Sequence, residues 1–139
     1  MAKWTAFPYD AADYTFDTAA LKKRWARLHA GDAEPWPQDP AAQAAWALYH
    51  AGAFQQAVQA GLKAGGAGLT AANKAQAIYA NYLEAREQVR QDLLLEAAAR
   101  AEALQHRQPE HTGAWYWQAY ALGRYSQGIS VAKALTQGL

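Results

Sequence analysis

The sequence carries one seven-residue frame twice, as GAFQQAV at 52–58 and as GRYSQGI at 123–129. In each copy a glycine is followed by an aromatic residue two positions later, then by Gln, a small residue and a β-branched aliphatic residue. A tight turn between antiparallel helices needs glycine where φ becomes positive, and a small residue lets the two helices cross closely. We therefore interpret the frames as two copies of one structural unit, each marking a turn between paired helices.

The rest of the chain has helical periodicity, and no run of alternating β-branched residues spans even five positions. Glycine and proline mark the expected joints at Gly52, 65–68, Pro109 and Gly123. The sequence thus predicts an all-α fold, and the glycine cluster is expected to be a loose connector ahead of a helix capped near Thr70. The predicted helices span about 17–30, 40–51, 54–64, 71–86, 89–107, 112–122 and 126–137.

A third unit is expected between the two frames. Trp46 and Trp117 each lie six residues before the turn glycine, and Asn81 lies halfway between them in AIYANYL. Three first helices are then in phase at about half of the 71-residue separation of the two frames, which is a period typical of helical repeats. The middle junction, AREQVRQD, lacks the glycine and is expected to be irregular.

This arrangement resembles the tetratricopeptide repeat (TPR) family, which places aromatic and small residues at these relative positions and a proline at the end of each repeat. Pro40 and Pro109 stand near such boundaries. The stretch WYWQAYALGRYSQGISVAKAL also resembles a bacterial TPR group, some of whose members accompany transporters. The resemblance implies a right-handed helical-hairpin solenoid of about seven helices. It divides the chain into 1–37, with an N-terminal arm, a first helix and a Pro-rich connector, and 38–139, with the repeats.

Composition narrows the choice of partners. The 139 residues carry a net charge of +1, which does not indicate binding to nucleic acid or to an acidic membrane surface. The basic run at 22–27 is typical of a solvated helix face. The chain has no cysteine, and its N-terminus has no apolar signal segment, so we expect a cytoplasmic protein.

Residue types that could carry catalysis are few. His29 and His50 each precede a helix-ending glycine by two residues, which favours a simple role at the negative helix end. His106 and His111 are five residues apart across a proline-marked joint, which is a poor spacing for metal ligands. Neither a GxSxG elbow nor a phosphate loop is present. We expect no enzyme activity, no metal and no cofactor.

Binding is the function that the resemblance implies, because the first helices of such repeats line a concave groove. There Asn81 would hold the backbone of a ligand, and Trp46 and Trp117 would either form an exposed aromatic surface or pack between helices. The lysine, asparagine and arginine set that grips a terminal carboxylate in some TPR domains is incomplete here. A less charged, more aromatic ligand is expected. The candidate groove residues are Trp46, Tyr49, His50, Lys74, Asn81, Glu84, Trp117 and Tyr120.

Three functions stay open. The first is a protein-interaction module or scaffold that binds a peptide or protein segment in the groove. The second is a small-molecule-binding accessory of a transport system, which needs an enclosed aromatic pocket. The third is a structural homo-oligomer whose groove is filled by its own aromatic arm, residues 4–16.

The C-terminus bears on the oligomer. Helical solenoids end in a capping helix whose outer face is polar. No such helix follows the last predicted helix in this sequence, so one of its faces would be uncovered. Either the chain is a fragment of a longer protein, or this face pairs with another subunit. The candidate interface residues are Ile129, Ala132 and Leu135.

Overall fold

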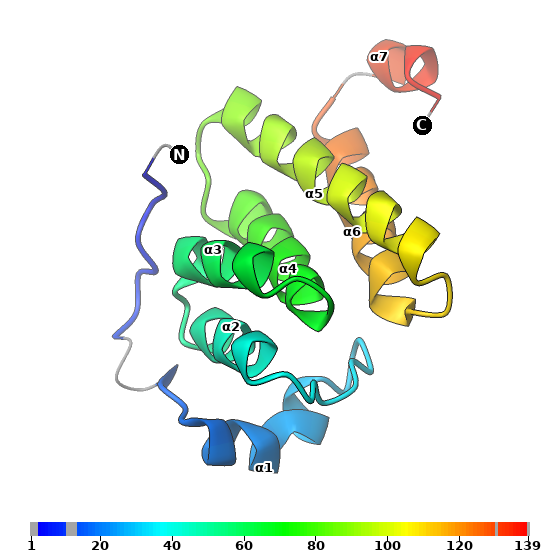
Figure 1. The fold of residues 1–139 in the computed structure, drawn as a ribbon. Helices are drawn as coiled ribbons and strands as arrows, with labels where there is room; N and C mark the ends of the chain where they lie inside the picture. The colour runs from blue at the N-terminus through cyan, green and yellow to red at the C-terminus, as the bar shows by residue number, and fades with distance from the viewer. Residues whose placement is uncertain (1–2, 11–13, 130, 139) are drawn as a thin grey trace.

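A computed structural model describes residues 3–10, 14–129 and 131–138, without the side chains of 131, 132 and 134. The described chain is helical and contains no strand, so the all-α prediction is confirmed. Figure 1 shows the helices in order from α1 near one end of the molecule to α7 at the other. Their bounds are α1 Thr18–Leu28, α2 Pro40–His50, α3 Phe54–Ala64, α4 Ala67–Tyr82, α5 Glu87–Arg107, α6 Thr112–Gln127 and α7 Val131–Thr136.

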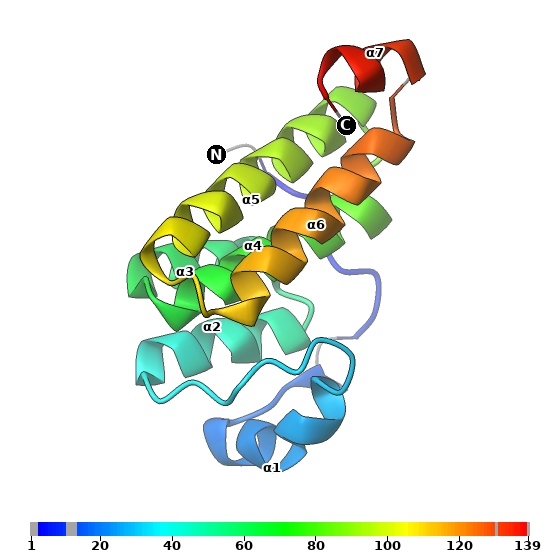
Figure 2. The ribbon, with the colours of Figure 1, turned by 90° about the vertical axis from the view of Figure 1, so that its right-hand side faces the viewer.

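Helices that follow one another from α2 to α6 pack against each other, and α4 also contacts both α2 and α6. The helices α2, α4 and α6 therefore lie side by side, which can be followed in Figures 1 and 2. The central position of α4 explains its composition, because its many small residues let neighbours approach from several sides. Most of its residues are buried, including Ala71, Ala72, Ala75, Ala77 and Ala80.

Local chemistry sets the starts of the first two helices. The side chain of Asp17 accepts a hydrogen bond from the Ala20 amide, and that of Asp39 accepts one from Ala41 just ahead of Pro40 at the first helical position. Gly52 has a φ of 80°, so the turn between α2 and α3 needs glycine as predicted. The ring of Phe7 packs where a Cβ at Gly52 would lie.

The second frame does not mark a turn. Gly123 lies inside α6, which continues to Gln127, so the predicted helix end at 122 is wrong. The helix continues because Tyr125, two residues beyond the glycine, is buried in the core formed by α4, α5 and α6. The two frames are therefore not equivalent at their glycines, although both contain residues that pack between helices.

The predicted start of α4 is also wrong. This helix begins at Ala67, and its first turn includes Gly68, while Thr70 is buried within it and caps nothing. Gly68 faces Gly61 of α3, where the two backbones touch. A Cβ on Gly61 would lie closer to the Gly68 carbonyl oxygen than the sum of their van der Waals radii, and one on Gly68 would lie 2.9 Å from the Gly61 oxygen. The glycine cluster thus serves close helix packing as well as the connection.

The described part of the N-terminal arm lies against α3 and α4. The ring of Trp4 stacks on Tyr79 with centroids 4.2 Å apart, and the Thr5 amide donates to the Tyr79 hydroxyl at 2.8 Å. The Trp4 amide also donates to Gln55 of α3. Figure 1 shows the arm and the connector 29–39 on different sides of the helices. No helix in the described part of the chain combines the length and apolar character required to cross a membrane.

We predict that Gly61→Ala lowers the free energy of unfolding by about 2 to 4 kcal/mol, because the added methyl group forces α3 and α4 apart. Gly123→Ala is the matched control, since no atom lies within 4 Å of its added Cβ. The control should raise the free energy of unfolding by about 0.5 to 1 kcal/mol, as alanine favours the helix. Urea unfolding measures both, and equal effects of the two substitutions would contradict the close packing.

Candidate functional site

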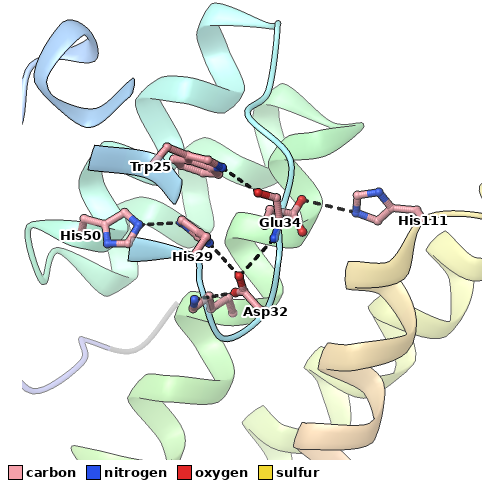
Figure 3. Close-up of polar contacts among 7 residues, drawn as sticks. Trp25, His29, Asp32, Glu34, His50 and His111 are labelled. Carbon is pink, nitrogen blue, oxygen red and sulfur yellow. Dashed lines mark hydrogen bonds and ion pairs between the residues drawn. The ribbon is translucent and has the colours of Figure 1, made fainter. Parts of the chain in front are cut away.

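The most polar buried region lies where the connector meets α2, α4 and the start of α6. The amino group of Lys74 on α4 donates to Asp32 Oδ2 at 2.7 Å, and both side chains are nearly inaccessible to solvent. A buried ammonium is costly unless it is paired, so this ion pair ties the connector to the central helix. Figure 3 shows the connector crossing this region with Asp32 and Glu34 turned toward it.

Three aromatic rings surround the amino group of Lys74. Its nitrogen lies 5.8 Å from the ring centroid of Trp46, 5.1 Å from that of Tyr49 and 5.1 Å from that of Trp117. We call Lys74 with these three residues of α2 and α6 the aromatic cage. Cation–π attraction to the rings adds to the ion pair with Asp32 and fixes the lysine in position.

Two histidines extend the network from Asp32. His29 Nδ1 lies 2.9 Å from Asp32 Oδ1, and His29 Nε2 lies 2.9 Å from His50 Nε2. Burial, with the nearby His29 and Lys74, lowers the pKa of His50 to about 3, so His50 is neutral near pH 7. The expected role of the histidines at the helix ends is therefore incomplete, because their side chains join α1, the connector and α2 to one another.

The two connector carboxyl groups have opposite environments. Burial by itself would raise the pKa of Asp32, but hydrogen bonds from His29 and Lys74 and the lysine charge outweigh it and hold the pKa well below its usual range. Between the acids lies Ala33, whose φ of 53° is in the left-handed region. The Glu34 amide donates to Asp32 Oδ1 at 3.2 Å, which closes this turn.

Glu34 has no comparable partner for its carboxyl group. The side chain is buried, and its nearest ion-pair atom is His111 Nε2 at 3.6 Å, while His111 itself bonds Thr70 at 2.7 Å. A Cβ at Gly113 would lie 2.7 Å from Glu34 Oε2, so α6 approaches the carboxyl closely. Burial and the negative Asp32 raise the pKa of Glu34 to about 7, although Lys74 opposes the shift. The backbone oxygen of Glu34 accepts the Trp25 indole N–H at 2.6 Å.

The arrangement holds a carboxylate and positions a segment of chain. Asp32, Lys74, His29 and His50 form one bonded network beside the aromatic cage, whereas the Glu34 carboxyl lies next to this network without a bond of its own to it. Among the described residues, no group of three or more histidine, cysteine or acidic side chains has a geometry that could hold a metal ion.

The structure brings together five of the eight candidate groove residues. Lys74 lies in the aromatic cage, and His50 is edge-on or stacked to Tyr49 and Trp46 with centroids 4.9 and 6.2 Å away. The other three lie further along α4 and α6 or beyond α4. The amide of Asn81 donates to the Tyr120 hydroxyl at 3.3 Å.

Glu84 has a structural role at the turn after α4. It accepts hydrogen bonds from the Tyr79 hydroxyl and from Arg86, and these bonds outweigh its burial and lower its pKa to about 2. Trp46 and Trp117 are 0% and 3% exposed, so the alternative of packing between helices is correct and an exposed surface at these two residues is wrong.

Sequence reasoning missed the connector as part of the site. Asp32 and Glu34 lie in DAEPWPQDP, which the sequence alone indicates only as a Pro-rich connector. Acidic residues in a proline-rich segment beside predicted helices are the available signal, but only the tertiary structure places Asp32 against Lys74. The third alternative, in which the arm fills the groove, is not what the described residues show, because the connector covers the cage while residues 3–10 lie on α3 and α4.

The candidate interface residues at the C-terminus differ in their environments. Ile129 packs against the core formed by α4, α5 and α6, whereas Leu135 on α7 is 72% exposed. The side chain of Ala132 lies outside the described residues.

A second feature is an apolar cleft of about 470 Å³ between the arm and the end of α4. Tyr9 and Tyr82 line it and are 65% and 68% exposed, so the cleft opens to solvent. It does not include the aromatic cage. The lining residues are Phe7, Pro8, Tyr9, Phe54, Ile78, Tyr82 and Leu83.

Comparison of the chain with protein-family models, with curated proteins and with solved structures found no match.

We predict that Glu34→Gln raises the free energy of unfolding at pH 8 by roughly 1 to 3 kcal/mol and changes this free energy little at pH 5. A carboxyl whose folded pKa is about 7, against an ordinary 4.5, contributes stability that is lost as the pH rises from 4.5 to 7. The lowered pKa of His50 has the opposite effect on stability. Because protonation of His50 is unfavourable in the folded protein, its contribution to stability increases as the pH rises from about 3 to 6.5.

Urea unfolding of both proteins at the two pH values gives the measurement. Glu110→Gln is the control, because Glu110 is exposed beside His111. A Glu34→Gln effect that is the same at pH 5 and pH 8 would show that Glu34 does not titrate in this range.

Proposed function

We propose that the protein is a non-enzymatic interaction module that binds an extended segment of a protein partner. In this proposal the helices form a TPR-like, right-handed helical-hairpin solenoid of about seven helices. The proposal is supported by the packing of consecutive helices from α2 to α6 and by the contacts of α4 with both α2 and α6. Such stacking produces one face made of first helices, which suits a chain segment.

The observation that carries the proposal is the open apolar cleft at the end of α4. Its volume of about 470 Å³ lies within the range of ligand sites, and its two exposed tyrosines offer the aromatic area that dominates binding at protein interfaces. Asn81 precedes Tyr82 but lies outside this cleft, where its amide donates a long hydrogen bond to Tyr120.

The open form of this cleft favours a chain segment over a small molecule. A carrier would enclose its ligand, whereas Tyr9 and Tyr82 here line the cleft with more than half of their surface exposed. The buried network also supports a binding role over an enzymatic one, because Asp32, Lys74, His29 and His50 are bonded to one another. The expected ligand is an uncharged peptide segment with at least one aromatic or long aliphatic side chain.

Selection of peptides from a random library displayed on phage tests this proposal. We expect selected sequences to be enriched in aromatic and aliphatic residues, and we expect Tyr82→Ala to weaken the binding of a synthesised peptide at least about tenfold. Tyr116→Ala is the matched control, because Tyr116 is a half-exposed tyrosine that does not line the cleft. Failure to select any peptide, or equal loss with both variants, would contradict binding in this cleft.

A further inference from the structure

The aromatic cage already holds a carboxylate from the same chain. Asp32 pairs with Lys74 at 2.7 Å, in the position that a partner's acidic side chain would take if the connector were absent. The connector reaches this position as a short acidic turn, with Ala33 in the left-handed region between the two carboxyl groups. Asp32 and Glu34 thus lie against the helices much as the acidic side chains of a bound peptide would. In this sense the connector is an intramolecular ligand of the aromatic cage.

The attachment of this segment has a strong point and a weak point. Asp32 has three bonds, to Lys74, to His29 and to the Glu34 amide. The Glu34 carboxyl is buried two residues away, and no hydrogen bond to its oxygens is found in the described chain. An ionised group left in that environment is unfavourable, whereas a protonated one is tolerated.

We propose that residues 31–37 are a proton-controlled latch, which covers the aromatic cage while the Glu34 carboxyl is protonated and releases it when that carboxyl ionises. The groups that face Glu34 decide the direction. Asp32 on its own segment repels the second negative charge, while Lys74 from α4 and His111 ahead of α6 oppose that repulsion only in part, since the lysine is already paired and His111 bonds Thr70. Burial lowers the pKa of His111, so this imidazole is neutral where Glu34 ionises.

The helices do not need the latch in order to pack. The helices α2 to α6 contact one another directly, whereas α1 joins them chiefly through α2. Release would therefore expose Lys74 and its three rings without unfolding the repeat. The uncovered site would accept an acidic segment, because a carboxylate is the partner that Lys74 has in the closed state. This site is separate from the cleft beside Tyr82, so the latch and the proposed peptide binding stand or fall independently.

Hydrogen exchange followed by NMR tests the latch at three hydrogen-bonded protons. These are the Ala33 amide, which donates to the His29 oxygen at 2.8 Å, the Glu34 amide and the Trp25 indole N–H. After correction for intrinsic rates, we expect their protection to fall about tenfold or more between pH 5.5 and pH 8.5. Amides in the middle of α3 and α4 should keep their protection, which separates local release from global unfolding.

Two variants complete the test. Glu34→Gln should keep the three protons protected at both pH values, with Glu110→Gln behaving as wild type. Lys74→Met, which fills the aromatic cage without a charge, should lower their protection at both pH values, while Lys63→Met at an exposed position should not. Protection that does not change with pH in the wild type, or that falls equally in Glu34→Gln, would overturn the proposal. Full protection in Lys74→Met would refute the claim that the aromatic cage is what holds the connector.

Discussion

The ion pair between Asp32 and Lys74 is the interaction on which the arrangement of the N-terminal third depends. Lys74 lies on the most buried helix, where an unpaired ammonium would be strongly destabilising. Three aromatic rings limit the access of water to it, and the connector supplies a carboxylate as its partner. Once Asp32 is in place, His29 and the turn at Ala33 follow from its hydrogen bonds, and α1 is held against α2.

Two carboxyl groups two residues apart differ in protonation because their partners differ. Asp32 has donors on both oxygens and stays ionised, whereas Glu34 has burial and a negative neighbour and keeps its proton up to about pH 7. Asp32 holds the connector in place, and Glu34 makes the attachment of the connector dependent on pH. The same contrast explains why a strongly bonded network is compatible with local opening, since the strength is concentrated at one residue.

The sequence was sufficient for the class of fold and for most helices, because periodicity, the aspartate caps and the glycine turn at 52 are local signals. It was insufficient at Gly123 and at the start of α4. There the burial of Tyr125 and the contact between Gly61 and Gly68 decide the helix bounds, and both depend on packing between different helices. The aromatic cage could be anticipated in part, because Trp46, Lys74 and Trp117 are all among the candidate groove residues. Its ligand could not, since nothing local to Asp32 indicates which lysine it meets.

The contact between Gly61 and Gly68 has a consequence for how such a sequence can change over time. Each glycine occupies a place where the other leaves no room for a methyl group, so neither can drift neutrally while its partner stays. A larger residue at one position requires a shift of the whole of α3. That shift would also move Ala57 and Val58, which belong to the same core cluster as Trp4. Variation between descendants of this chain should therefore gather in the exposed faces of α1, α5 and α6 and leave this pair unchanged.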